Sequence, residues 1–157
     1  MGWSWVALIA FLAACSGGPP EVQDLLLDSG DFSGQAVVES KAQISETAQG
    51  DASAQVELSG PDFVLGQSLV LFENQDSARA VLAEIEKDQL ARDTYPIEPG
   101  NFKDVSEVLI ERRGGDETLT LIFVEGRALV RITLSGPGRW ALLPVYAEEA
   151  RAKAGKQ

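Results

Sequence analysis

Three runs of alternating apolar side chains, separated by two tight turns, constrain the fold of this chain more than any other feature. The runs cover residues 104–113, 117–124 and 127–134, and the turns are Gly-Gly-Asp at 114–116 and Glu-Gly at 125–126. Alternation places every second side chain on one face of a strand, and glycine-containing turns join antiparallel neighbours. The sequence therefore predicts a three-stranded antiparallel meander.

The last run shows which side chains we expect on each face of that meander. Ala128, Val130, Ile132 and Leu134 fall on one face, and Arg127, Arg131 and Thr133 fall on the other. A sheet with this pattern has one face on a core and one face in water.

Further strands and one helix are predicted before the meander. Residues 35–46 and 53–58 resemble an antiparallel pair with one wet face, and residues 68–73 resemble a buried strand that follows an interruption at Gly66. Ala78, Val81, Leu82 and Ile85 then recur at helical spacing, after Asn74 or Asp76 as the N-cap.

A second helix is predicted at the C-terminus, where Pro144 can occupy the first turn and residues 145–153 are helical in composition. We expect residues 155–157 to fray. The predicted class is α+β, with a mainly antiparallel sheet of about five to six strands, a central helix at about 75–92 and a C-terminal helix at about 144–154.

The N-terminus has the features of an export signal. Residues 5–14 are apolar, which is too short for a membrane span of about 20 residues but suits a signal-peptide core. Cys15 follows directly, and a Gly/Pro stretch that cannot continue a helix follows Cys15.

Leu12-Ala13-Ala14-Cys15 resembles the lipobox of bacterial lipoproteins. The resemblance implies a diacylglycerol on the Cys15 thiol, cleavage just before it, and a further acyl chain on the new N-terminus. Residues 1–14 would then be the signal peptide, 15–21 the lipidated cysteine and tether, and 22–154 a single domain. One departure is that no Lys or Arg precedes the apolar run, so an uncleaved apolar anchor and a plain secretory signal stay open as alternatives.

The lipobox also implies a location. Two or more acyl chains anchor a protein stably, whereas one chain does not, and the segment from Ser16 to Glu21 reaches at most about 20 Å. The expected location is the extracytoplasmic face of a membrane in the cell envelope. Position 16 is Ser rather than Asp, which by the sorting rule of this family favours the outer membrane in a cell that has two.

The folded part resembles small exported lipoproteins with a PsbP-like fold. The relevant stretches are residues 69–85, a strand that runs into an Ala-rich helix, and residues 117–134, a closing hairpin. This group includes photosystem accessory proteins and envelope lipoproteins, and the resemblance transfers no functional residue to this chain.

Composition excludes several classes of function. The net charge of −11 argues against nucleic-acid binding, which requires a basic surface. The chain has no histidine and one cysteine, so it lacks the commonest general base and cannot build an ordinary zinc site or an internal disulfide. No catalytic motif, cofactor site or metal site is predicted, and Cys15 is the one residue with an assignable chemical role.

Four other features of the sequence are candidate sites. Asp28 and Asp31 could be calcium ligands, but a turn explains them better, since a calcium loop needs more oxygens at fixed spacing. The loop at 94–101, with Tyr95, is a candidate functional loop or a rigid connector. The pair Arg112-Arg113 could grip an anion or end a strand in solvent, and Trp140 is expected to cap the core.

The sequence thus favours a membrane-anchored envelope lipoprotein with a non-catalytic binding or accessory role. Its expected partners are the membrane, through lipid on Cys15, and an envelope protein or a small apolar ligand, with no nucleic acid. Two alternatives remain: a carrier of lipid or another apolar ligand in a cavity under the sheet, and a hydrolase of envelope polymers that uses two carboxylates.

Overall fold

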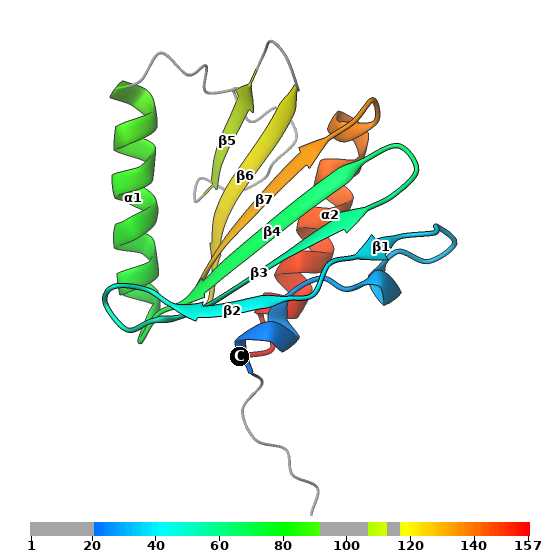
Figure 1. Cartoon of the computed structure of the whole chain (residues 1–157). Coiled ribbons are helices and arrows are strands. Elements are labelled where there is room, and N and C mark those ends of the chain that lie inside the picture. The colour runs from blue at the N-terminus through cyan, green and yellow to red at the C-terminus, as the bar shows by residue number, and fades with distance from the viewer. Residues whose placement is uncertain (1–20, 92–106, 113–116) are drawn as a thin grey trace, which may run out of the picture.

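The computed structural model describes residues 21–91, 107–112 and 117–157, with side chains for 21–88 and 117–157. In these ranges one antiparallel sheet carries a helix on each face (Figure 1). The fold class is α+β, as the sequence predicts. The strands are β1 (Val38–Glu39), β2 (Gln43–Glu46), β3 (Ala52–Ser59), β4 (Val64–Leu71), β5 (Glu107–Arg112), β6 (Thr118–Glu125) and β7 (Ala128–Ser135). The helices are α1 (Gln75–Ala91), α2 (Arg139–Ala154) and the short 3₁₀ helices η1 (Val22–Leu25) and η2 (Ser29–Asp31).

The strand order is β1-β3-β4-β7-β6-β5, and β2 pairs with β3 beside β1. The predicted meander is confirmed as β5-β6-β7, and a second meander precedes α1. The two meanders join where β4 pairs with β7, with Gly66 opposite Thr133 and Ser68 opposite Arg131. The sequence did not indicate this junction, because residues far apart in the chain form it.

The main core lies between the sheet and α2. The predicted inward side chains of β7 are all buried, and Arg131 is exposed on the opposite face. Leu25, Leu27 and Phe32 close this core from the N-terminal segment, where the rings of Phe32, Phe63 and Tyr146 contact one another with centroids 4.8 to 5.7 Å apart.

A smaller core lies on the other face, under α1. Ala78 and Leu82 of α1 pack on Ile122, Val124 and Leu129 of the sheet. The predicted helix is confirmed, and Asn74 is its cap, since the Asn74 side-chain oxygen accepts a hydrogen bond from the Ser77 amide at 2.9 Å.

Three expectations about the C-terminal region were wrong. Helix α2 begins at Arg139, so Pro144 lies inside it. Burial of Leu143 and Tyr146 on the core favours the longer helix despite the lost backbone bond. Trp140 does not cap the core, because it is 45% exposed.

The tail beyond α2 does not fray in the way expected. The Gln157 side chain donates to the Glu125 carbonyl at 2.7 Å and accepts from the Arg127 amide at 3.2 Å. These two bonds fix the last residue to the turn between β6 and β7.

Candidate functional site

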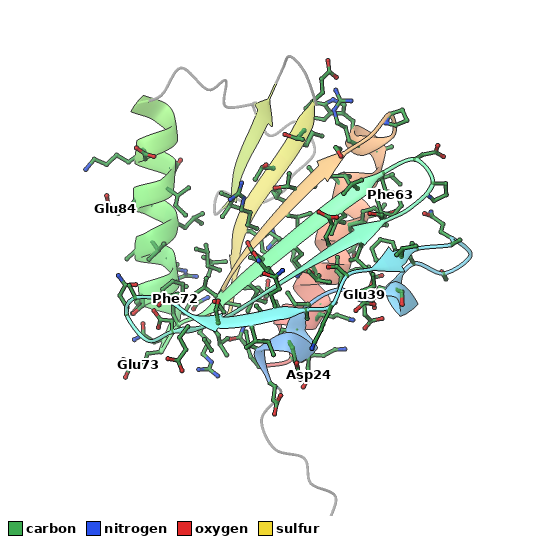
Figure 2. All side chains as sticks on the ribbon, viewed as in Figure 1. Asp24, Glu39, Phe63, Phe72, Glu73 and Glu84 are labelled. Atoms are coloured by element: carbon green, nitrogen blue, oxygen red, sulfur yellow. The ribbon has the colours of Figure 1, made fainter. Side chains whose placement is uncertain are left out.

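Helix α1 covers only part of its face of the sheet. Its contacts lie over β6 and the adjoining end of β7, where the sheet residues are apolar. Helix α1 leaves the rest of this face, over β3, β4 and the other end of β7, uncovered (Figure 1). This uncovered part carries side chains (Figure 2), most of them polar. We call this uncovered part the open face, defined by Gln55, Glu57, Gly66, Ser68, Arg131 and Thr133.

Strand register brings these six residues together in two rows. Gln55, Ser68 and Arg131 lie opposite one another across β3, β4 and β7. Glu57, Gly66 and Thr133 form the next row. Each strand contributes alternate residues, so all six side-chain positions point away from the α2 core.

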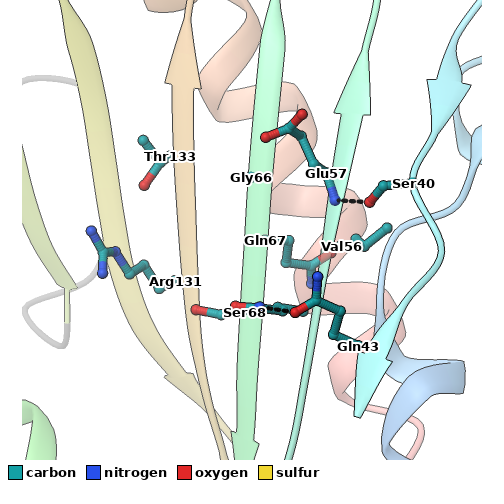
Figure 3. A pocket seen from close by; sticks show the side chains of 10 residues that line it. Ser40, Gln43, Val56, Glu57, Gly66, Gln67, Ser68, Arg131 and Thr133 are labelled. Carbon is teal, nitrogen blue, oxygen red and sulfur yellow. Dashed lines mark hydrogen bonds between the residues drawn. The ribbon is translucent and has the colours of Figure 1, made fainter.

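The open face is hollowed into a depression of about 300 Å³ (Figure 3). Its lining also includes Ser40 and Gln43 from the edge of the sheet. At its centre is Gly66, whose missing side chain leaves open space: a Cβ built there would have nothing within 4 Å. A glycine inside a strand weakens it and is typical of places where a ligand or another backbone approaches closely.

Hydrogen bonds fix several of the polar groups around the depression. The Gln55 side chain donates to the Gln43 side-chain oxygen at 2.7 Å, and the Glu57 amide donates to the Ser40 hydroxyl at 2.9 Å. The Thr133 and Thr120 hydroxyls lie 3.1 Å apart. These hydrogen bonds hold part of the rim of the depression in a defined arrangement.

Arg131 is the one positive charge in the depression's lining, and Glu57 is the one carboxylate. Within the described ranges the Arg131 guanidinium makes no hydrogen bond or ion pair, and in Figure 3 it lies on the β6 side, turned away from Glu57. Three other described cations have carboxylate partners: Arg139 pairs with Glu117, Arg151 with Glu125, and Lys153 with Asp28 and Asp31.

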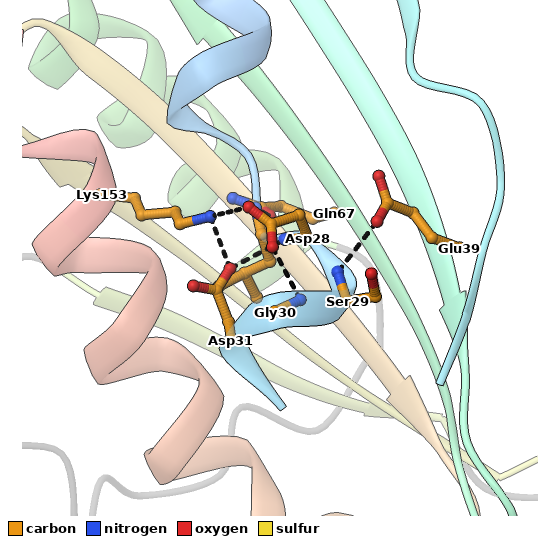
Figure 4. Close-up of polar contacts among 8 residues, drawn as sticks. Asp28, Ser29, Gly30, Asp31, Glu39, Gln67 and Lys153 are labelled. Atoms are coloured by element: carbon orange, nitrogen blue, oxygen red, sulfur yellow. Dashed lines mark hydrogen bonds and ion pairs between the residues drawn. The ribbon is translucent and has the colours of Figure 1, made fainter. Parts of the chain in front are cut away.

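Asp28 and Asp31, near the N-terminal end of the domain, form ion pairs with Lys153 near its C-terminal end (Figure 4). Lys153 of α2 lies 2.6 Å from Asp28 and 2.5 Å from Asp31. The hydrogen bond from Lys153 lowers the pKa of the Asp28 carboxyl. Burial alone would lower the pKa of Lys153, but the bonds to both aspartates outweigh it and raise that pKa.

The turn interpretation of these aspartates agrees with the structure. The Asp28 carboxylate caps η2 by accepting from the Gly30 amide at 2.8 Å, and no group of residues able to hold a metal ion occurs in the described ranges.

The other sequence candidates are placed only in part. Cys15, the loop at 94–101 and Arg113 lie outside the described residues, and Arg112 is the last residue of β5. Sequence reasoning put Arg131 on the wet face but did not single it out, and it treated Gly66 only as an interruption. A glycine amid the apolar residues of β4 was the available signal.

Comparisons with known proteins give a likeness of fold. No protein-family model and no curated protein matches the chain. Among solved structures, the extracellular domain of PknH from Mycobacterium tuberculosis is similar, with a TM-score of 0.61 and 14% sequence identity. The match covers 88% of this chain and 96% of the PknH domain. At that identity the likeness concerns the fold alone.

Proposed function

We propose that this protein is a lipid-anchored protein of the bacterial envelope whose domain binds a partner or ligand through the open face. The observation that carries the binding role is the depression centred on Gly66, with the unpaired Arg131 in its lining. The anchoring role rests on the lipobox-like residues that end at Cys15.

One further observation agrees with a domain outside the cytoplasm, since the solved neighbour is an extracellular domain in its own protein. Among the described residues, no helix combines the length and the apolar composition that a bilayer crossing needs. Under this proposal the acyl chains on Cys15 hold the protein at the membrane, and the short tether keeps the open face near the bilayer.

The polar depression favours binding of a polar molecule over the two alternatives. An apolar carrier needs an apolar cavity, whereas serine, threonine and glutamine line this depression. A two-carboxylate hydrolase needs a facing pair of acids, and among the described lining residues Glu57 is the single acid. Both alternatives therefore receive less support than a binding role.

The anchor is tested with Cys15→Ala and the matched variant Ser16→Ala. We expect Cys15→Ala to lose labelled fatty acid and to leave the membrane fraction, because the thiol that carries the lipid is gone. Ser16→Ala should keep both, since it leaves the thiol in place. If Cys15→Ala incorporates as much label as the parent chain and stays in the membrane fraction, the anchoring proposal is wrong.

The binding role is tested by cross-linking cells that express the protein, with Gly66→Val as the comparison. A specific partner or ligand should be recovered with the parent chain and lost with Gly66→Val, because the valine fills the depression. Equal recovery with both chains would show that binding does not use the open face.

A further inference from the structure

We infer that the depression binds a small anionic polyol, that is, a carboxylate or phosphate monoester attached to a hydroxylated skeleton, and that Arg131 holds its anionic group. This inference rests on the proposed binding role of the open face and adds the chemical class of the ligand. Its three supports are the unpaired guanidinium, the neutral hydrogen-bonding rows and the missing side chain at Gly66.

The Arg131 guanidinium, which has no partner among the described residues, points to an anionic ligand. The chain carries 24 acidic and 13 basic residues, so carboxylates are abundant, yet none of the described ones pairs with Arg131. A guanidinium offers parallel N–H donors that match a carboxylate or phosphate in two-point contact. The net charge of −11 disfavours anions in general, so an anion is retained only where Arg131 provides direct contact.

The neutral side chains point to hydroxyl groups on the same ligand. Ser68 and Gln55 share the row of Arg131, and Thr133 and Glu57 lie in the next row. Hydroxyl and amide side chains both donate and accept hydrogen bonds, as ligand hydroxyls do. Glu57 accepts only, so it suits a hydroxyl donor and disfavours a second anionic group at that end.

The position of Glu57 relative to Arg131 gives the ligand a direction. The two residues are two strands and two residues apart in the register, which corresponds to roughly 12 Å between their backbones. The Arg131 guanidinium lies on the β6 side (Figure 3), so a ligand that contacts both residues must span at least this interval. The anionic group then lies at the β7 end and the hydroxyl groups at the β3 end.

Gly66 lets such a ligand reach the sheet itself. It sits in the middle of β4, between Glu57 and Thr133, and a Cβ at that position would project into open space. The Cβ of a valine at that position meets no heavy atom within 4 Å, and valine has the higher strand propensity. We therefore expect Gly66→Val to fill the binding space and to keep the fold, which the melting temperature checks.

Binding is measured by calorimetry on the full chain, purified from whichever fraction contains it, so the result does not depend on lipidation. The probes are glucose 6-phosphate and glucuronate as anionic polyols, glucose as the neutral analogue, and inorganic phosphate as the bare anion. We expect at least one anionic polyol to bind at least tenfold more tightly than either glucose or inorganic phosphate.

Two variants and two matched controls test the residues. Arg131→Gln should weaken binding at least tenfold, and Gly66→Val should abolish it with an unchanged or higher melting temperature. Arg79→Gln removes an exposed charge from α1, and Ser59→Val adds the same side chain to the same face of β3, outside the lining. Both controls should bind like the parent chain.

The ligand source is resolved with glycerophosphoinositol and with vesicles that contain phosphatidylinositol, using the Cys15→Ala chain so that no anchor contributes. Vesicle binding that Arg131→Gln abolishes identifies a lipid headgroup, and binding of the soluble probes alone identifies a free solute. Equal affinity of Arg131→Gln for the anionic probes, or no binding of any anionic probe at millimolar concentration, overturns the inference. Neither result bears on the fatty-acid labelling that tests the anchor.

Discussion

Lys153 shows how single residues hold the N-terminal segment on the domain. Its stem is mostly buried, with 14% of the side chain exposed, and its ammonium contacts both Asp28 and Asp31. The Asp28 side chain is 54% exposed, so solvent screens part of the attraction. One lysine thus links α2 to η2, near the first described residues of the chain.

Lys153→Met should lower the free energy of unfolding by about 1 kcal/mol at neutral pH, since it removes two partly exposed ion pairs and keeps the apolar stem. Urea titration measures the change, and Lys87→Met on the exposed side of α1 is the control. An equal loss in both variants would show that the ion pairs do not stabilise the domain.

The difference between the parent chain and Lys153→Met should depend on pH in a fixed direction. The pKa of Asp28 is lowered from 3.8, so its contribution is present above pH 3.8 and is lost as the pH falls through the folded-state pKa. The pKa of Lys153 is raised from 10.5, so its contribution is present below pH 10.5 and is lost above the folded-state pKa. A difference that grows toward either extreme would contradict this assignment.

At the scale of elements, the edge of the sheet is interrupted by a bulge between β1 and β2. From Glu39 to Gln43 the edge advances four residues, while its partner β3 advances three, from Leu58 to Gln55. One extra residue on the edge strand bends it and breaks its ladder. Such a break protects an exposed edge from pairing with other chains, and it also places Ser40 and Gln43 on the rim of the depression.

Helix α2 carries Pro144 in its interior, where a residue with an N–H would add one backbone hydrogen bond. Pro144→Ala should raise the free energy of unfolding by about 1 kcal/mol, less than the full cost of about 3 kcal/mol for an interior proline because Pro144 is half-buried and its packing is lost. Thermal unfolding measures the gain. A lower melting temperature would mean that the packing of the proline ring outweighs the missing bond.

At the scale of the whole molecule, both ends of the described chain contact the same framework. The N-terminal segment is linked to α2 by the ion pair between Asp28 and Lys153. The Leu27 amide also donates a hydrogen bond to the buried Gln67 side chain of β4 at 2.7 Å. The C-terminal residue is fixed to the β6–β7 turn. The two ends of the described chain are thus both connected to the sheet that carries the open face.

Removal of Gln157 should weaken the β6–β7 turn without unfolding the domain. The Arg127 amide loses its acceptor, so its hydrogen exchange should accelerate, while the amides in the middle of β4 stay protected. Gln157→Ala should match the deletion, because it removes the same side chain. Unchanged exchange at Arg127 would show that the contact does not persist in solution.

The sequence by itself determined the local elements: the meander, a strand before α1, and α1 with Asn74 or Asp76 as its cap. Each depends on periodicity or turn chemistry within some twenty residues, so each can be derived without knowing the rest of the chain. The same reasoning failed for the start of α2, because Leu143 and Tyr146 gain more from core burial than the helix loses at Pro144.

Only the tertiary structure decided that Glu57, Gly66 and Arg131 share one surface. Local alternation assigns each residue a face, but it does not state which strands are neighbours. The pairing of β4 with β7 joins positions 57 to 71 residues apart. That pairing depends on which packing of two meanders buries the most apolar surface against α2. The depression on the open face is a consequence of the pairing between β4 and β7.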